Sequence, residues 1–175
     1  ALSPSLRQSA REMNLLASAG YGMSETGPLI ALARSEQPDE VCRAGRLAPL
    51  VRARIVDNAT TDQPLDNRAQ GELVLRAPWL TQAYANDAEA SEGLWSDGWL
   101  HTQDVATRAP NGDITIRDRI KDLIKSGGEW ISSVEMEALA LEIPAVEEAA
   151  FIAAPSERWS ERQVAVLAAS QAQDD

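Results

Sequence analysis

Residues 20–28 read GYGMSETGP, and this stretch is the starting point for assigning the fold. Its three glycines and one proline interrupt regular helix and strand patterns. The same stretch carries an aromatic ring at Tyr21, hydroxyls at Ser24 and Thr26, and a carboxylate at Glu25, which could hold a hard cation. The segment predicts a functional loop, with a glycine-rich connector as the alternative.

Two common phosphate-binding motifs do not fit this stretch. A dinucleotide fingerprint beginning at Gly20 and Gly22 would place its third glycine at Glu25, setting a carboxylate against a pyrophosphate. Gly22 and Gly27 have the spacing of a phosphate loop, but Pro28 stands where the loop's lysine would be. The segment therefore belongs to neither class.

A nucleophilic triad is also a poor match. Ser24 and Asp104 are present, and His101 is the only histidine. The chain has no Gly-x-Ser-x-Gly elbow, and a histidine two residues before an aspartate on an expected strand is more often structural. We therefore favour a structural role for His101.

The rest of the chain predicts two units that follow a first helix. That helix begins at Pro4, while residues 14–19 could extend it or form a short buried strand. Short β-type runs predict a small antiparallel sheet or barrel, at residues 51–57, 72–76, 100–105 and 114–117. Residues 110–113, with Asn and Gly at their centre, predict a tight hairpin turn.

A second, smaller α+β unit is expected after a boundary near residues 117–121. Ser132 has capping-box spacing to Glu135, so a helix should run from there to about residue 142. Pro144 ends it, and residues 146–153 and 163–169 are predicted strands.

The amino-acid composition of the chain limits the kinds of partner that it can bind. The 175 residues include 27 acidic and 16 basic side chains, giving a net charge of −11, which opposes binding to nucleic acid or anionic lipid. No apolar run approaches the ~20 residues that cross a bilayer. A single cysteine and a single histidine exclude an internal disulfide and a zinc site, so a cytoplasmic setting is predicted. The first residues lack an initiator Met and a signal pattern, so the chain is expected to begin within a longer protein.

Four ordered segments together resemble the adenylate-forming superfamily of acyl-CoA synthetases, luciferases and peptide-synthetase adenylation domains. They are GYGMSETGP at residues 20–28, GELVLRAP at 71–78, WLHTQDVA at 99–106 and RDRIKDLIKSGGEWISSVEME at 117–137. The last run is most similar to medium- and long-chain fatty-acid–CoA ligases.

The resemblance implies a mixed α/β and α+β fold. Residues 1–50 would end a large AMP-binding subdomain, residues 51–118 would form a distorted antiparallel β-barrel, and residues 119–175 would begin a small carboxy-terminal domain. It also implies that residues 14–18 form a strand leading into the loop.

The resemblance further implies an ATP site. Tyr21 would stack on adenine, with Gly20 and Gly22 letting the backbone close around it. Ser24 would contact the α-phosphate, and Glu25 would hold Mg²⁺. These implied roles make Ser24 and Glu25 catalytic candidates.

Residues farther along the chain would complete the site. Asp104 would accept hydrogen bonds from both ribose hydroxyls, because a carboxylate's two oxygens suit a vicinal diol. Arg119 would add a charged fork on the ribose and phosphate side. Lys121 would be the hinge about which the small domain turns between two half-reactions.

Three residues after the hinge are candidates for the thioester-forming step. Lys125 would approach the site as a further catalytic residue, and Gly128 and Trp130 would line the path of coenzyme A. Without the resemblance, Lys121 and Lys125 would be assigned to a solvated strand edge.

The function implied is ATP- and Mg²⁺-dependent activation of a fatty acid or another carboxylic acid to an acyl-adenylate, followed by thioester formation with coenzyme A. The chain lacks the family's Ser/Thr/Gly-rich phosphate loop and its carboxy-terminal lysine, so these residues alone are predicted to be inactive.

Gln103 replaces a usual glycine, and if that position needs an unusual backbone angle, nucleotide binding should weaken. The alternatives are a peptide-synthetase adenylation domain and a non-catalytic remnant that binds nucleotide or a partner. A homo-oligomer is compatible with the sequence.

Overall fold

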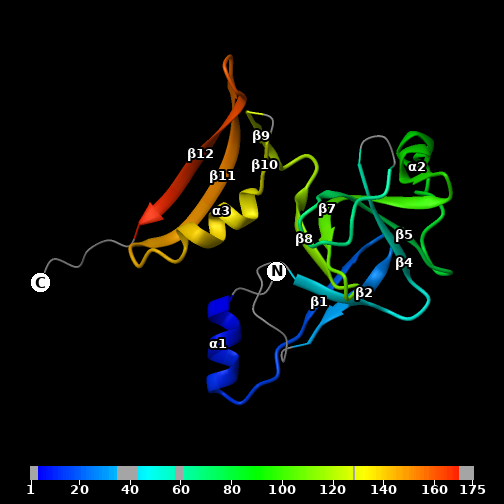
Figure 1. Ribbon diagram of the computed structural model, residues 1–175, viewed down its shortest axis with the longest axis horizontal. Coiled ribbons are helices and arrows are strands. Elements are labelled where there is room, and N and C mark those ends of the chain that lie inside the picture. The colour runs from blue at the N-terminus through cyan, green and yellow to red at the C-terminus, as the bar shows by residue number, and fades with distance from the viewer. Residues whose placement is uncertain (1–3, 35–42, 58–60, 128, 170–175) are drawn as a thin grey trace, which may run out of the picture. The chain divides into compact units, whose positions relative to one another are not determined.

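The computed structural model describes residues 4–34, 43–57, 61–127 and 129–169 (Figure 1). The chain divides into two compact units, Ala1–Ile116 and Arg117–Asp175. Each is described separately below. The three-part subdomain division implied by the resemblance stays a prediction.

The first unit contains two helices and most of the strands. Its elements are α1 (Pro4–Glu12), β1 (Ala19–Met23), β2 (Gly27–Ala33), β3 (Arg43–Leu47), β4 (Arg52–Val56), β5 (Gly71–Arg76), α2 (Ala88–Leu94), β6 (Trp95–Ser96), β7 (Trp99–Arg108) and β8 (Ile114–Arg119), the last of which runs into the second unit. The helix predicted from Pro4 and the four predicted β-type runs are confirmed.

The strands of the first unit form one antiparallel sheet in the order β1-β2-β3-β8-β7-β5-β4, with the short β6 paired to β7. The mixed α/β class with antiparallel strands is thus confirmed. The path has two ends, at β1 and β4, and no pairing among the described residues closes it into the expected barrel. The β1–β2 hairpin instead continues the sheet beyond β3.

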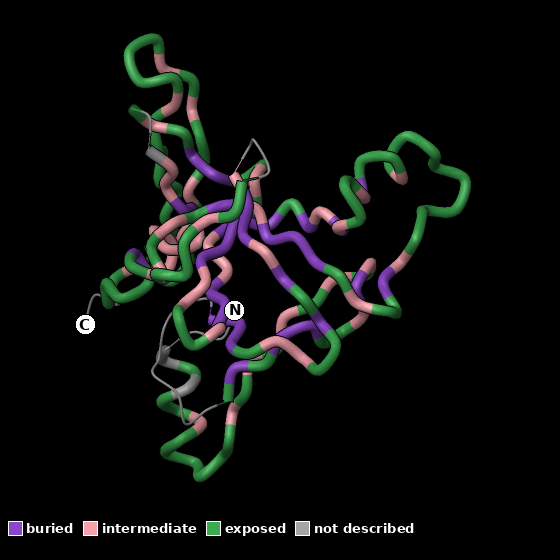
Figure 2. The backbone as a smooth tube through the Cα atoms, turned by 45° about the vertical axis from the view of Figure 1, so that its right-hand side comes forward, coloured by how far each residue is buried: buried purple, intermediate pink, exposed green. Residues whose placement is uncertain are grey.

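Apolar residues that alternate along these strands form the core. Buried side chains of β2, β4, β5, β7 and β8 meet in one cluster that includes Ile30, Ile55, Leu73, Leu75, Leu100 and Ile114. Figure 2 shows this concentration of buried residues in the strands of the larger sheet. Burying a side chain of this size contributes ~1.5–3 kcal/mol.

The β7–β8 turn forms where the sequence predicts it, with different backbone angles. Gly112 has a φ of 89°, as the turn requires, but Asn111 is not among the residues with positive φ. Asn111 instead accepts a hydrogen bond on Oδ1 from the Asp113 backbone N–H at 3.0 Å. Backbone hydrogen bonds also close the turn, from the Gly112 N–H to the Ala109 carbonyl and from the Ala109 N–H to the Asp113 carbonyl, each at 2.9 Å.

The strand expected at residues 14–18 is not observed. Residues 15–18 have no regular structure, and β1 begins at Ala19. Leu15 and Leu16 are 57% and 84% exposed, so neither side chain gains the burial that would hold it in a sheet. Pairing with β2 accounts for the later start of the strand.

The second unit contains β9 (Ile124–Ser126), β10 (Glu129–Ile131), α3 (Ser133–Ala140), β11 (Val146–Ser156) and β12 (Ser160–Ala169). Its sheet has the order β10-β9-β12-β11. The expected helix and both late strands are confirmed. Ser132 caps α3, because its Oγ accepts a hydrogen bond from the Glu135 N–H at 3.1 Å.

Among the residues that the structure describes, none of α1, α2 and α3 is long and apolar enough to cross a membrane.

Candidate functional site

The glycine-rich segment, residues 20–28, forms the tip of a hairpin. The prediction that this segment is an irregular loop is therefore wrong. Ser24, Glu25 and Thr26 form the turn between β1 and β2, closed by the Thr26 N–H donating to the Met23 carbonyl at 3.1 Å. The following residue, Gly27, has a φ of 76°, a conformation that glycine adopts without strain. The hairpin presents Ser24 exposed and Glu25 partly exposed.

The close approach of the two strands in this hairpin requires glycine at one position. A Cβ on Gly22 would lie 2.6 Å from the backbone carbon of Pro28 and 2.7 Å from its oxygen, distances that no real contact reaches. A Cβ on Gly20 would meet only the Leu29 side chain, at 3.2 Å. Gly22 therefore allows the two strands to approach each other.

Two motif residues from distant parts of the chain meet on the first unit. The Tyr21 hydroxyl donates a hydrogen bond to Oδ2 of Asp104 at 2.6 Å, although 83 positions separate them. Asp104 is 8% exposed, and Tyr21 is partly buried against the main core. The structure thus places an aromatic ring and a buried carboxylate together.

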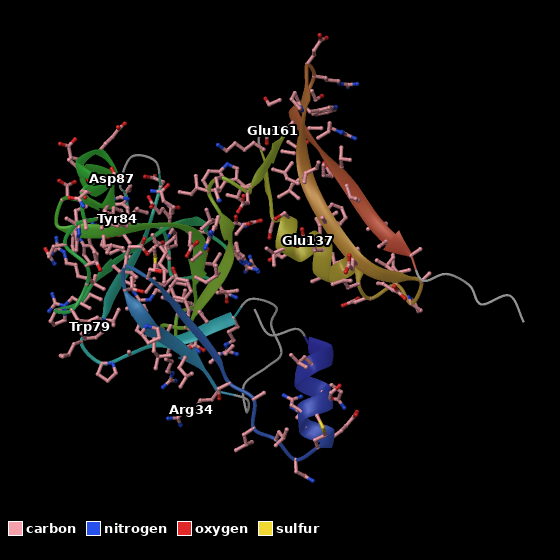
Figure 3. The ribbon with its side chains drawn as sticks, turned by 180° about the vertical axis from the view of Figure 1, so that it is seen from behind. Arg34, Trp79, Tyr84, Asp87, Glu137 and Glu161 are labelled. Atoms are coloured by element: carbon pink, nitrogen blue, oxygen red, sulfur yellow. The ribbon has the colours of Figure 1, made fainter. Side chains whose placement is uncertain are left out.

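The turn is tied to the segment that joins β5 to α2. The Thr81 N–H donates to the Glu25 carbonyl at 2.9 Å, and the Trp79 indole N–H donates to the Thr26 carbonyl at 3.0 Å. Figure 3 labels Trp79 and Tyr84, which both come from this segment. These bonds hold the tip of the hairpin in place.

The Glu25 carboxylate has a defined partner. The Tyr84 hydroxyl donates to Glu25 Oε1 at 2.5 Å. This hydrogen bond to the carboxylate, with a smaller effect of burial, raises the pKa of Tyr84 above its ordinary value of 10.0. Neutral Tyr84 therefore orients the side chain that the sequence singled out for Mg²⁺.

A magnesium ion is compatible with this turn. Mg²⁺ in nucleotide enzymes is usually held by one or two carboxylates together with the phosphates of the substrate. Within the described part of the chain no three acidic, His or Cys side chains form a metal cluster. Glu25 offers one carboxylate at the turn, which is too few ligands for an ion held by the protein alone.

The triad reading does not match the geometry. His101 Nδ1 lies 2.8 Å from Glu72 Oε2, while the Asp104 carboxylate bonds Tyr21. The structural reading of His101 is the one that these contacts support.

The remaining predicted site residues lie in the second unit. Arg119 and Lys121 are exposed, at the end of β8 and in the turn after it. Lys125 on β9 pairs with Trp130 on β10, and its backbone N–H donates to Glu161 Oε2 at 2.6 Å. Gly128 lies outside the described residues.

Sequence reasoning gave no role to Glu72, Trp79 or Tyr84. Glu72 lies in the segment GELVLRAP, which resembles the superfamily, so the sequence did contain an indication that this residue could matter. Trp79 and Tyr84 lie in the connection between β5 and α2, and only their hydrogen bonds to the turn at residues 24–26 indicate a role for them.

Known proteins resemble this chain in sequence and in fold. Residues 1–85 match the family model described as AMP-binding enzyme. The chain is 40% identical over 159 residues to the long-chain-fatty-acid–CoA ligase of Thermus thermophilus, covering 85% of this chain and 29% of that protein. The chain belongs to the adenylate-forming (AMP-binding) superfamily.

A second curated CoA ligase is similar to this chain to about the same degree. The 3-methylmercaptopropionyl-CoA ligase of Ruegeria lacuscaerulensis is 42% identical over 164 residues, which are 88% of this chain and 30% of that protein. The chain therefore spans less than a third of the length of these two curated relatives.

A solved member has the same fold. The o-succinylbenzoate CoA synthetase of Bacillus subtilis, in complex with its acyl-adenylate intermediate, matches with a TM-score of 0.86 and 29% identity over 97% of this chain and 34% of that one. The same enzyme has also been solved with ATP and magnesium ion, at a TM-score of 0.85 and 28% identity over 95% of this chain and 34% of that one. The superfamily predicted from the four motifs is thus confirmed.

Proposed function

We propose that this chain is part of an acyl-CoA ligase and supplies the adenosine-binding surface of its ATP site. The observation that carries the proposal is the hydrogen bond between Tyr21 and Asp104, because it joins the two motif residues assigned to adenine and ribose. The CoA ligases among the relatives support the reaction class.

In the proposed reaction, a carboxylate oxygen of the acid attacks the α-phosphorus of ATP. The bond from that phosphorus to the bridging oxygen breaks, pyrophosphate leaves and an acyl-adenylate remains. The sulfur of coenzyme A then attacks the acyl carbonyl carbon, and AMP leaves as the thioester forms.

Residues of the first unit would bind and orient the nucleotide. Tyr21 offers its ring to adenine, and Asp104 accepts hydrogen bonds from the ribose hydroxyls. A carboxylate has about four acceptor positions, so the Tyr21 bond is compatible with further hydroxyl donors. Ser24, exposed on the turn, would donate to the α-phosphate.

Glu25 would hold a magnesium ion that reaches the site with ATP. When bound, the ion draws negative charge from the phosphate oxygens as pyrophosphate leaves. The hydrogen bond from Tyr84 fixes one carboxylate oxygen of Glu25 in advance.

Residues of the second unit are proposed to bind the nucleotide, to form the hinge and to take part in thioester formation. Lys121 would be the hinge, and Arg119 would contact the ribose and phosphate side of the nucleotide. Lys125 would approach the site as a further catalytic residue, and Gly128 and Trp130 would line the path of coenzyme A. The proposal includes coenzyme A as the thiol substrate and a fatty acid as the carboxylic acid. It also includes a cytoplasmic location.

The direct test is nucleotide binding by the chain itself. We expect AMP to bind and Asp104→Ala to weaken binding by ~10-fold or more, because a carboxylate contributes ~1.5–3 kcal/mol through such hydrogen bonds. Isothermal titration calorimetry measures both. Equal affinities of the wild-type chain and the Asp104→Ala variant would refute the ribose assignment.

Turnover by the chain alone is expected to be absent. Pyrophosphate release from ATP with a fatty acid should not exceed that of a Glu25→Ala variant. Release well above that control would show that these 175 residues suffice for adenylation.

A further inference from the structure

Strand β7 carries a bulge at the residue before Asp104. Opposite β5, Glu72 pairs with Val105 and Val74 pairs with His101, so three residues of β7 stand opposite Leu73 alone. At the centre of this bulge Gln103 has a φ of 61°. A non-glycine residue pays ~1 kcal/mol or more for this left-handed conformation, so neighbouring contacts must hold it.

One carboxylate makes these contacts. Glu72 Oε1 accepts hydrogen bonds from the Gln103 backbone N–H at 3.0 Å and from the Gln103 side-chain amide at 3.1 Å. Its Oε2 lies 2.8 Å from His101 Nδ1. The side chains of Glu72 and His101 are 15% and 16% exposed, so water competes weakly for the contact between them, whereas Gln103 itself is exposed.

The residues on either side of Gln103 are buried and bonded. Thr102 Oγ1 donates to the Leu73 carbonyl at 2.7 Å and accepts from the Asp104 N–H at 3.1 Å. The Asp104 carboxylate in turn meets the Tyr21 hydroxyl. The direction of the Asp104 side chain therefore depends on the backbone angles of the bulge.

We propose that Glu72 is a positioning residue for nucleotide binding, which holds Gln103 in its left-handed conformation and so directs the Asp104 carboxylate towards the ribose. The inference rests on the proposed function, because it takes Asp104 as the ribose ligand. In this proposal Glu72 acts through its bonds to Gln103 and is not itself a ligand of the nucleotide.

The test compares AMP with 2′,3′-dideoxy-AMP, which lacks the two hydroxyls that Asp104 would bind. Calorimetric titration of the wild-type chain, Glu72→Ala, Asp104→Ala and the double variant gives the affinities. We expect Glu72→Ala to weaken AMP binding by ~5–10-fold and to change dideoxy-AMP binding by less than ~2-fold. The double variant should bind AMP no more weakly than Asp104→Ala, because both changes remove the same interaction.

Two further variants separate positioning from folding. Glycine adopts the left-handed conformation without strain, so Gln103→Gly in the Glu72→Ala background should recover much of the lost AMP affinity. Glu72→Gln keeps the shape of the side chain, so the AMP affinity of this variant should lie between the affinities of the wild-type chain and of Glu72→Ala. Asp62→Ala, which removes another bonded carboxylate from the same unit, is the control and should leave both affinities unchanged.

The outcomes distinguish the inference from the proposed function. If Asp104→Ala weakens AMP binding and Glu72→Ala does not, the positioning role is refuted and the proposed function stands. Equal loss of both nucleotides in Glu72→Ala, with no recovery on Gln103→Gly, also refutes it. If Asp104→Ala leaves AMP binding intact, or the wild-type chain binds no AMP, the proposed function fails and the inference fails with it.

Discussion

Gly22 and Gly93 differ in the space that their missing side chains leave. A Cβ on Gly22 would overlap the Pro28 backbone, whereas nothing lies within 4 Å of a Cβ on Gly93 in α2. We expect Gly22→Ala to lower the free energy of unfolding by ~1–3 kcal/mol through this overlap. Gly93→Ala should raise it by ~0.5–1 kcal/mol, since alanine favours helix. Urea denaturation measures both, and an equal effect of the two changes would contradict the hairpin geometry.

Asp66 provides a pH prediction. Its Oδ1 accepts backbone hydrogen bonds from Ala69 and Arg68, each at 2.8 Å, and these bonds lower the pKa of Asp66 below 3.8. The stabilisation from this group is therefore present above pH 3.8 and is lost as pH falls through the lower, folded-state pKa. An NMR titration of the Asp66 carboxyl should show the lowered midpoint in the wild-type chain. A midpoint at or above 3.8 would contradict the two backbone hydrogen bonds to Asp66.

At Gln103 the sequence raised the right question but could not answer it. The resemblance indicated that a glycine is usual there, and the positive φ of Gln103 shows why a glycine would suit that position. The compensating contact comes from Glu72 on a neighbouring strand. Such a contact depends on strand register, which a single sequence does not determine. The effect on nucleotide binding stays a prediction.

Among the strands of the first unit, β4, β5, β7 and β8 were predicted, whereas β1, β2, β3 and the short β6 were not. β4, β5, β7 and β8 were predicted because their residues favour a half-buried pleated surface. β1 reads AGYGM, which has no such preference, and it forms through pairing with β2. Tertiary pairing therefore decided the element that carries Tyr21.

Helix caps give a matched pair of predictions at this scale. Ser132 caps α3 and also donates to the Arg117 carbonyl at 2.8 Å, whereas Asp87 caps the exposed start of α2 through the Ala90 N–H at 3.0 Å. Ser132→Ala should cost ~1–2 kcal/mol and Asp87→Ala about 1 kcal/mol. Because the caps belong to different units, hydrogen exchange should show faster opening only in the unit that carries each change. Loss of protection throughout the chain in either variant would contradict this separation.

For the whole molecule, the two units differ in the size of their apolar cores. Among the residues that the structure describes, the buried apolar side chains of the second unit are Leu123, Ile124 and Ala140, whereas the first unit buries the large cluster of its main sheet. On β11 and β12, Ile152, Val164 and Val166 are 55%, 41% and 57% exposed. Local stability follows buried apolar contacts.

We therefore expect amide protons of β11 and β12 to exchange faster than those of β5 and β7 under native conditions. Mass spectrometry of peptides after deuterium labelling resolves these strands. Uniform protection across both sheets would show that the two units open together.

The four motifs were sufficient to predict the superfamily, because all four occur in the family's order over about 120 residues. Individual motifs were less informative about geometry. The turn at residues 24–26 and the Glu72 contacts depend on which strands pair, and this is visible only in the folded chain.

The bond from the Trp79 indole to the Thr26 carbonyl has an optical consequence. Indole emission shifts in wavelength when its N–H changes partner or its surroundings become wetter. With the other four tryptophans replaced by phenylalanine, the emission of Trp79 would report the state of the turn that carries Ser24 and Glu25. Trp79 is thus a built-in fluorophore, placed where nucleotide arrival at the hairpin tip could be followed in real time without an added dye.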